Sequence, residues 1–412
     1  MTSNTAALEK SSFQQQQKTT YHVLFIIGLC HLLNDSLQSV IPAMFPILEK
    51  SMSLTYTQLG FIAFTLNIVS SVLQPIIGAY TDKKPVPYAL PIGLSISMLG
   101  ILGLAFSPSF KMVLFFVFFI GVGSAVFHPE GSRVAYMAAG SRRGLAQSIY
   151  QVGGNSGQAL APLITALVLV PLGQPGIVYF TLVAALAVIL LIYIAKWYKV
   201  KLPSLPEKTG KISTTARSLA NKKAANFAAS IILFIIFARS WYGTSIASFY
   251  AFYVIEKYGV SIQASQGYVF LFLVMGAVGT FLGGPLADRF GKRTVIITSI
   301  MASIPLTFAL PFAGPVTAYF LLALIGLILL SSFSVTVVYA QELFPGRIGT
   351  VSGLTIGFAF GMGAIGAVAI GALIDQFGLT TIMIAISLLP VLGITSYFLP
   401  TDKTIIEWQN NE

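Results

Sequence analysis

The stretches GAYTDKK (Gly78–Lys84) and GPLADRFGKR (Gly284–Arg293) decide the fold, because each is a short polar loop that follows a long apolar run. They repeat at an offset of 206 residues, which is half of the 412-residue chain. Asp82 in the first stretch corresponds to Asp288 in the second. The repeat predicts two equivalent halves, each with the same loop after its second apolar segment.

The composition indicates a membrane protein. Hydrophobic residues make up 56% of the chain, charged residues only 9%, and the mean hydropathy is +0.83. A soluble domain carries about 25% charged residues. Apolar runs of roughly 20 residues, long enough for a ~30 Å hydrocarbon core, recur without the alternation of a β-barrel. They predict an all-α polytopic membrane protein with twelve transmembrane helices. The predicted spans are 21–48, 57–81, 87–107, 111–138, 144–170, 177–199, 225–256, 262–288, 293–313, 315–342, 347–374 and 379–400.

The basic residues gather on one side of this map. Nineteen of the 24 lysines and arginines, including eight between Lys196 and Lys223, fall on the side of the two termini, and three fall on the other side. Because basic residues concentrate in cytoplasmic loops, both termini are predicted to be cytoplasmic. The net charge of +11 is thus a sign of topology, and no nucleic-acid partner is expected.

A long polar stretch, KVKLPSLPEKTGKISTTARSLANKK (Lys199–Lys223), separates the two halves. Two pseudo-symmetric six-helix bundles related by an axis normal to the membrane are an architecture of transporters. The predicted segments are a disordered cytoplasmic N-terminus at 1–20, a six-helix bundle at 21–198, a cytoplasmic linker at 199–224, a second bundle at 225–400 and a cytoplasmic tail at 401–412.

Several chemistries lack a sequence signature. No Walker glycine loop with lysine is present, which argues against ATP as the energy source. One cysteine and three histidines do not predict a zinc site, so no metal or other cofactor is expected. We therefore expect no enzymatic activity, and the proton gradient is the expected energy source.

The first predicted span carries a polar stripe. His31, Asn34, Asp35 and Gln38 follow one another at i, i+3, i+4 and i+7, so they share one helix face. Asp35 lies near the midplane, where an uncompensated carboxylate costs several kcal/mol. It is predicted to take up protons, with His31 as a neighbouring proton group, and Asn34 and Gln38 are candidate substrate ligands. The alternative is a permanently paired aspartate that only fixes helix packing.

The seventh predicted span carries the opposite charge. Arg239, moved back by the repeat offset, falls at Leu33, within one turn of Asp35. Equivalent positions of two parallel repeats are expected to face each other across a central cavity. Tyr242 and Tyr253 continue the face of Arg239 and are candidate substrate-binding residues, although aromatic residues also serve packing or contact lipid.

The fourth predicted span contains GSAVFHPEGSRVAYM (Gly123–Met137), with three ionisable groups inside an apolar segment. Glu130 and Arg133 are three residues apart and can pair. One interpretation is a gate in which Glu130 alternates between Arg133 and a proton; the other is a static salt bridge. His128 is a candidate for proton transfer or a hydrogen-bonded packing residue.

The loop pattern Gly-x-x-x-Asp-(Arg/Lys)-x-Gly-(Arg/Lys)-(Arg/Lys) resembles that of the major facilitator superfamily. The second copy keeps it well, whereas Pro85 replaces the second glycine of the first copy. The resemblance covers nearly the whole chain. It implies a conformational latch formed by Asp82, Asp288, Arg289 and Arg293.

A narrower resemblance comes from HPEGSRVAYMAAGSRRGLAQSIYQVGGNSGQALAPL (128–163), HLLNDSLQSVIPAMFPIL (31–48) and ARSWYG (238–243). These stretches resemble the fosmidomycin-resistance branch, a group of proton-driven drug exporters in the bacterial cytoplasmic (inner) membrane. The fifth span adds a polar stripe of Gln147, Gln151, Asn155 and Gln158, of which Gln151 and Asn155 are candidate substrate ligands.

Glycines of the fifth span, Gly153 and Gly157, resemble part of an exporter motif and are expected to bring spans five and eight together. Four glycines of span eleven are expected to serve packing. They are Gly349, Gly353, Gly357 and Gly361.

The combined expectation is a monomer in the lipid bilayer that exchanges protons for a small molecule by alternating access. A proton enters on Asp35 or Glu130 while the compound leaves, and Arg239 and Arg133 favour an anionic, phosphonate-bearing substrate. Two alternatives remain open, namely a proton symporter that imports an organic anion or sugar, and a receptor or scaffold that transports nothing.

Overall fold

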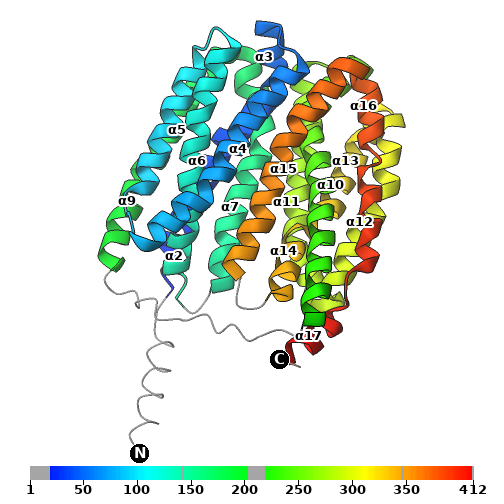
Figure 1. The fold of residues 1–412 in the computed structure, drawn as a ribbon. Coiled ribbons are helices and arrows are strands. Elements are labelled where there is room, and N and C mark those ends of the chain that lie inside the picture. The colour runs from blue at the N-terminus through cyan, green and yellow to red at the C-terminus, as the bar shows by residue number, and fades with distance from the viewer. Residues whose placement is uncertain (1–18, 141–142, 203–218, 345–347, 411–412) are drawn as a thin grey trace, which may run out of the picture.

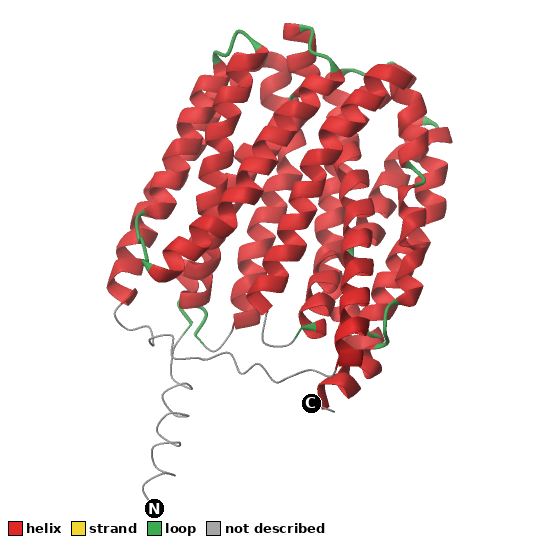
Figure 2. Ribbon diagram, viewed as in Figure 1, coloured by secondary structure: helices red, strands yellow, loops and turns green. Residues whose placement is uncertain are grey.

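The structure, a computed structural model, describes residues 19–140, 143–202, 219–344 and 348–410. Within these ranges the chain is helical and has no strand (Figures 1 and 2). Among the described residues, eleven helical segments are long and apolar enough to cross a membrane. A shorter apolar helix, α5 (Ala89–Ala105), supplies a twelfth span. The chain is therefore an all-helical membrane protein, as the sequence predicts.

The helices follow the order of the predicted spans. Spans one to six are formed by α2 (Tyr21–Ala43) with α3 (Phe45–Met52), α4 (Tyr56–Lys83), α5, α6 (Phe110–Ala138), α7 (Arg143–Ile164) with η1 (Thr165–Leu169) and α8 (Val170–Leu172), and η2 (Gln174–Tyr179) with α9 (Phe180–Lys201). Spans seven to twelve are formed by α10 (Leu219–Tyr258), α11 (Ile262–Phe290), α12 (Lys292–Ala309) with η4 (Leu310–Phe312), α13 (Pro315–Leu330) with α14 (Ser332–Leu343), α15 (Ile348–Phe377), and α16 (Leu379–Ile386) with η5 (Leu389–Phe398).

The predicted tail contains a helix. Helix α17 (Asp402–Asn410) lies at the same face of the bundle as the start of α10 (Figure 1). Ile405 of α17 is 1% exposed and belongs to an apolar cluster of the last six spans. The Tyr339 hydroxyl of α14 donates to the carbonyl of Pro400 (2.7 Å), directly before α17. The tail is therefore packed against the bundle.

Glycines bring α2 and α7 into backbone contact. A Cβ atom added to Gly153 would lie 2.1 Å from the carbonyl oxygen of Gly28, and one added to Gly157 would lie 2.2 Å from that of Leu32. Small residues permit this close approach of helices in membranes. The expectation that these two glycines pack against span eight is wrong, because both face span one.

The glycines of α15 also differ from the expectation. A Cβ atom added to Gly357 or Gly361 would meet no heavy atom within 4 Å, so these two glycines are not packing contacts. Gly349 and Gly353, for which packing was also expected, lie outside the residues whose surroundings the structure describes.

The two sets of six spans contact each other through α4 with α15 and through α7 with α11. The residues that touch lie near the start of α4 and the end of α15, at the face opposite α17 (Figure 1). A Cβ atom on Gly60 would lie 2.4 Å from the carbonyl oxygen of Ala367, and one on Gly371 would lie 2.3 Å from that of Tyr56. At this face the two halves are in backbone contact.

We expect Gly157→Ala to destabilise the protein, because its new methyl group would overlap the Leu32 carbonyl that α2 presents. Overpacking of this kind costs about 1–3 kcal/mol. The thermal unfolding midpoint in detergent should fall, whereas Gly361→Ala, whose methyl group has open space, should leave it unchanged or raise it. Equal midpoints for the two variants would contradict the assigned helix contact.

Candidate functional site

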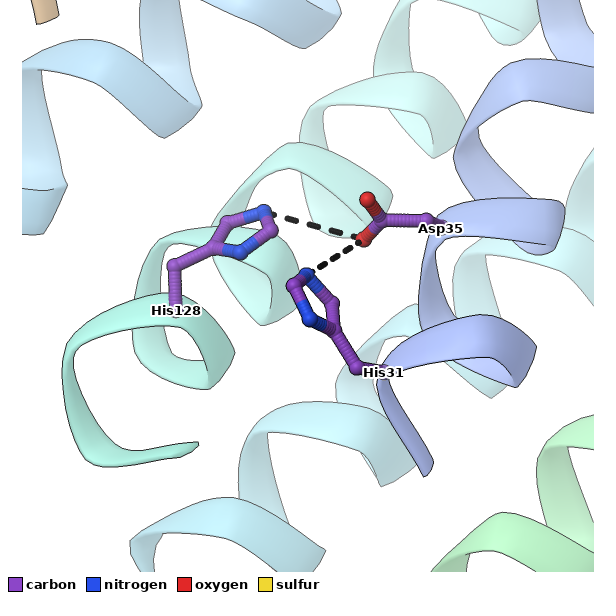
Figure 3. A group of neighbouring side chains, drawn as sticks. All are labelled: His31, Asp35 and His128. Carbon is purple, nitrogen blue, oxygen red and sulfur yellow. Dashed lines mark ion pairs between the residues drawn. The ribbon is translucent and has the colours of Figure 1, made fainter. Parts of the chain in front are cut away.

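Two histidines and one aspartate meet inside the first six spans. Helix α2 carries His31 and Asp35 on one face, both 4% exposed, and α6 brings His128 to the same point (Figure 3). The Asp35 Oδ1 atom lies 3.5 Å from His31 Nε2 and 3.9 Å from His128 Nε2. We call these three residues the triad. The sequence predicted each of them as a proton group and placed His31 beside Asp35, but it did not predict that His128 joins them.

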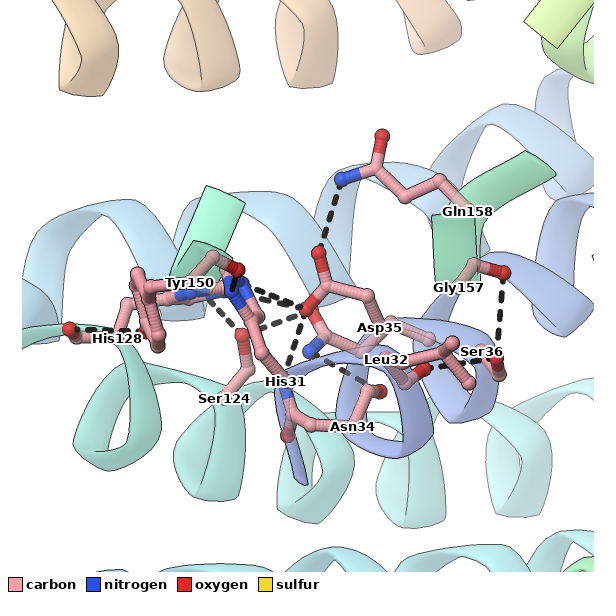
Figure 4. A network of polar contacts seen from close by, with 12 residues as sticks. His31, Leu32, Asn34, Asp35, Ser36, Ser124, His128, Tyr150, Gly157 and Gln158 are labelled. Carbon is pink, nitrogen blue, oxygen red and sulfur yellow. Dashed lines mark hydrogen bonds and ion pairs between the residues drawn. The ribbon is translucent and has the colours of Figure 1, made fainter. Parts of the chain in front are cut away.

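Two amides complete the surroundings of the Asp35 carboxylate. Asn34 Nδ2 donates to Oδ1 and Gln158 Nε2 donates to Oδ2, each at 3.0 Å (Figure 4). Neighbouring donors from α2 and α7 therefore satisfy both carboxylate oxygens. This matters because an unpaired carboxylate in a membrane interior is strongly unfavourable. Asn34 was a predicted substrate ligand, and here it supports Asp35.

The ring of His31 has a fixed orientation. Its Nδ1 atom lies 2.7 Å from the carbonyl oxygen of Tyr150, and its ring stacks on the Tyr150 ring at 4.0 Å between centroids. A carbonyl oxygen only accepts, so Nδ1 carries the hydrogen. The Nε2 atom faces Asp35. It presents a lone pair to the carboxylate when the ring is neutral and an N–H when the ring is protonated. A lone pair there repels the carboxylate, so a proton bound in the triad is stabilising.

Gly154 of α7 makes the space for the triad. A Cβ atom at this position would lie 2.6 Å from His31 Nε2 and 3.0 Å from Asp35 Oδ2. Sequence analysis missed Gly154 and Tyr150. The available signal was the unusual Gly153-Gly154 pair within a polar helix face, but the partner helix cannot be read from one sequence.

The triad atoms lie within 4.8 Å of one another. Two imidazoles and one carboxylate can share protons, and the same groups can also ligate a divalent cation. The sequence predicted no metal site, but the structure brings together three side chains of the kinds that can ligate a metal ion. The arrangement of these three groups is one that can bind a proton or a cation.

A second polar chain leads away from the triad. Ser124 of α6 donates to Gln38 Oε1 (2.7 Å) and lies 3.0 Å from the Ser70 hydroxyl of α4. Gln74 Nε2 donates to Ser70 (2.9 Å). Gln38 was a predicted substrate ligand. In the structure it instead joins α2 to α6, and through Ser124 to α4.

Glu130 and Arg133 form the predicted pair. Arg133 Nε lies 3.3 Å from Glu130 Oε1, and Glu130 is fully buried. Arg133 also donates to the Thr81 carbonyl (2.6 Å) and hydroxyl (3.2 Å) near the end of α4. This pair therefore ties α6 to α4. The charge of Arg133 is neutralised by Glu130, so its expected role as a substrate ligand is not evident in this conformation.

Arg239 belongs to a separate cluster. It is 6% exposed, donates to Thr336 Oγ1 (3.1 Å) and Ser332 Oγ (3.4 Å), and lies over the Phe333 ring at 4.9 Å. All these partners are on α14, within the last six spans. Among the described residues, none of its assigned contacts is a carboxylate. The expectation that Arg239 faces Asp35 is therefore wrong, because each group is enclosed by its own half.

The two candidate substrate-binding tyrosines are packing residues in this conformation, which is the alternative left open by the sequence. Tyr242 and Tyr253 are each 1% exposed and lie inside the last six spans. The Tyr253 hydroxyl donates to the Pro311 carbonyl (2.9 Å). Gln151 is exposed and Asn155 is half-buried, so among the predicted amide ligands these two remain accessible on α7.

The structure describes only part of the predicted latch. Asp288 and Arg289 are exposed, and the Asp82 side chain is not described. Arg293 donates to the carbonyls of Leu399 (2.7 Å) and Tyr397 (2.8 Å), so it joins spans nine and twelve of the same half. These contacts of Arg293 lie within one half, whereas the predicted latch would join the two halves.

Sequence comparison places the chain among transporters. The Major Facilitator Superfamily profile matches residues 24–366 and 270–411. The chain is 68% identical to the MFS-type transporter YfnC of Bacillus subtilis (strain 168), over 98% of this chain and 99% of that protein. It is 44% identical to the fosmidomycin resistance protein of Escherichia coli (strain K12), over 94% of each.

Solved structures share the fold at low sequence identity. A bacterial homologue of the human lysosomal transporter Spinster has a TM-score of 0.77 at 17% identity, covering 94% of this chain and 98% of that one. The nucleoside transporter NupG has a TM-score of 0.70 at 14% identity, covering 94% and 99%. The resemblance predicted from the loop motif is confirmed, and the chain belongs to the major facilitator superfamily.

Proposed function

We propose that the protein is a proton-coupled exporter that exchanges protons for a small anionic compound related to fosmidomycin. The observation that carries this proposal is the triad, in which two imidazole Nε2 atoms face one buried carboxylate oxygen. The face that bears α17 is assigned to the cytoplasm, following the bias of basic residues. The compound would leave from the cytoplasm by alternating access.

The triad supports proton coupling through its charge balance. With one bound proton beyond the neutral imidazoles, the carboxylate is compensated and the site is neutral. With none, it holds a net negative charge in a low-dielectric interior, where the energetic cost is high. Because an imidazole nitrogen binds a proton reversibly, such a site is suited to proton exchange. Exchange requires access from each side in turn, which alternating access provides.

Arg239 supports an anionic substrate. Its described hydrogen-bond partners are neutral hydroxyls, so the guanidinium charge is not cancelled by a described carboxylate. Arginine binds phosphonate and carboxylate groups through paired N–H donors. The relative named for fosmidomycin resistance supports the same class of compound. Arg239 would become accessible when the halves move apart.

The separation of the two clusters determines how coupling works. The described contacts of Asp35 lie in the first six spans and those of Arg239 lie in the last six. Direct competition for one site is therefore not needed. Each ligand shifts the equilibrium between the two conformations only through its different affinity for them.

A proton symporter is the second candidate. Protonation removes the net negative charge of the triad, so an anion inside the bundle is no longer repelled by it. This favours binding of proton and anion together, which is the requirement for symport. The direction of the driving gradient distinguishes the two functions.

We expect proteoliposomes with an acidic interior to accumulate labelled fosmidomycin, because outward proton flow drives inward drug flow in an antiporter. A protonophore should abolish the accumulation, and a chelator of divalent cations should not. Accumulation only with an alkaline interior would establish symport. Accumulation under neither gradient would contradict proton coupling.

We expect Asp35→Asn to reduce gradient-driven accumulation at least tenfold, because an amide cannot take up the proton. Exchange of labelled for unlabelled drug without a gradient should persist, since the amide keeps the size of the side chain. The matched control is Glu407→Gln, which removes an exposed carboxylate of α17. Full gradient-driven accumulation in Asp35→Asn would remove this residue from the mechanism.

We expect Arg239→Gln to weaken binding of fosmidomycin by roughly tenfold or more, because a charge-assisted contact is lost. Binding of a neutral transported compound should change much less. Equilibrium binding to purified protein measures both. Arg293→Gln, which alters a guanidinium bound to carbonyls near α17, is the control. An equal loss of affinity for neutral and anionic ligands would exclude the idea that Arg239 recognises the negative charge of the substrate.

A further inference from the structure

We propose that Asp375 is a latch that closes the face opposite α17 by capping helix α4 of the other half. Asp375 lies in the last turn of α15, whereas α4 belongs to the first six spans. This function is separate from proton coupling, because Asp375 is exposed and the triad is buried.

The Asp375 carboxylate binds the first backbone groups of α4. Its Oδ1 atom accepts from the Tyr56 N–H (3.0 Å), and its Oδ2 atom accepts from the Thr57 N–H (2.8 Å) and the Thr57 hydroxyl. The first N–H groups of a helix have no partner within the helix, and a negative charge is favourable there. A carboxylate is therefore well suited to this position.

Helix α4 caps only part of its own start. The Thr55 hydroxyl accepts from the Gln58 N–H (3.2 Å), and the Gln58 side chain accepts from the Thr55 N–H (2.9 Å). This capping box leaves the N–H groups of Tyr56 and Thr57, which Asp375 then satisfies. The cap of α4 is complete only while the two halves are in contact.

Packing around Asp375 closes the same face. A Cβ atom added to Gly371 would lie 2.3 Å from the Tyr56 carbonyl oxygen, so the backbones of α15 and α4 are in direct contact. The Tyr56 ring lies edge-on to Phe252 (5.1 Å between centroids) and Phe249 (6.2 Å) of α10. Opening this face must therefore separate Asp375 from α4 and also break these contacts.

The sequence around Asp375 repeats the loop motif of α11. GALIDQFG (Gly371–Gly378) and GPLADRFG (Gly284–Gly291) share glycine, leucine, aspartate, phenylalanine and glycine at the same spacing. Both final glycines follow a helix with nearly the same backbone angles, φ 84° and ψ 151° for Gly378 and φ 86° and ψ 146° for Gly291. A non-glycine residue is disfavoured at such angles.

The two copies lie at opposite faces of the bundle, because α15 ends opposite α17 and α11 ends near it (Figure 1). Inverted three-helix repeats within each half account for this arrangement. Asp375 is engaged with the first six spans, whereas among the described residues no contact assigns Asp288 to them. Within the described part of the chain, therefore, only the Asp375 copy of the motif contacts the opposite half.

The latch predicts a population shift. Without the Asp375 charge, the start of α4 loses its cap in the closed state and loses nothing in the open state. Removal of a helix cap changes an equilibrium by about two- to thirtyfold. We therefore expect Asp375 variants to favour the state in which this face is open.

The experiment measures the distance between the halves at this face. Spin labels are placed at Lys50→Cys in α3 and Gln263→Cys in α11, two exposed positions, in a Cys30→Ser background. Pulsed electron spin resonance on full-length protein in nanodiscs, without drug or gradient, gives the distance distribution. Asp375→Asn and Asp375→Ala should increase a longer-distance population severalfold, with the larger effect for Ala, and Asp375→Glu should restore the shorter one.

Glu256→Gln is the matched control, because Glu256 accepts from Thr380 (3.4 Å) at the same face within one half. Its distance distribution should equal that of the parent protein. Thermal unfolding confirms that each variant is folded, and Asp375→Asn, which preserves side-chain size, serves if Asp375→Ala does not fold. An unchanged distribution in folded Asp375→Asn would overturn the latch, and so would an equal shift in Glu256→Gln.

Discussion

The burial of the Asp35 carboxylate is the constraint on which the first six spans depend. Asn34 of the same helix supplies one donor to this carboxylate, and its remaining contacts need groups from other helices. Gln158 of α7 and His128 of α6 provide them, and both helices must approach α2 closely to do so. The glycine contacts between α2 and α7 permit that approach. Packing and chemistry therefore impose the same arrangement on these three helices.

Much of this architecture was predictable, because hydropathy fixes the spans and helical spacing fixes which residues share a face. His31 and Asp35 are four residues apart on one helix, so their proximity follows from the sequence alone. The position of Gln158 against Asp35 does not follow, because it depends on how α7 is rotated about its axis. Local spacing likewise predicted Glu130 with Arg133, but not the Thr81 carbonyl that Arg133 binds.

The errors have one physical cause. The repeat offset relates Arg239 to Asp35 along the sequence, but it does not determine the direction in which either side chain points. Arg239 turns toward the hydroxyls of α14, which satisfy its N–H groups inside its own half. Tyr253 similarly turns toward the Pro311 carbonyl. In both cases a nearby hydrogen-bond acceptor, invisible in a helical projection, decided the orientation.

Helices that are well satisfied within each half move most easily as rigid bodies, because a buried polar group resists any motion that strips its partners. The triad and the Arg239 cluster both meet this condition. The start of α4 does not, since two of its N–H groups depend on a carboxylate from the other half. Energy differences between conformations are therefore concentrated where the halves exchange hydrogen bonds, at the faces of the bundle. The same motif ends α11 and α15 with nearly the same glycine geometry at opposite faces. Comparable latches at the two faces would give the two conformations near-equal stability, which is what a carrier needs to alternate.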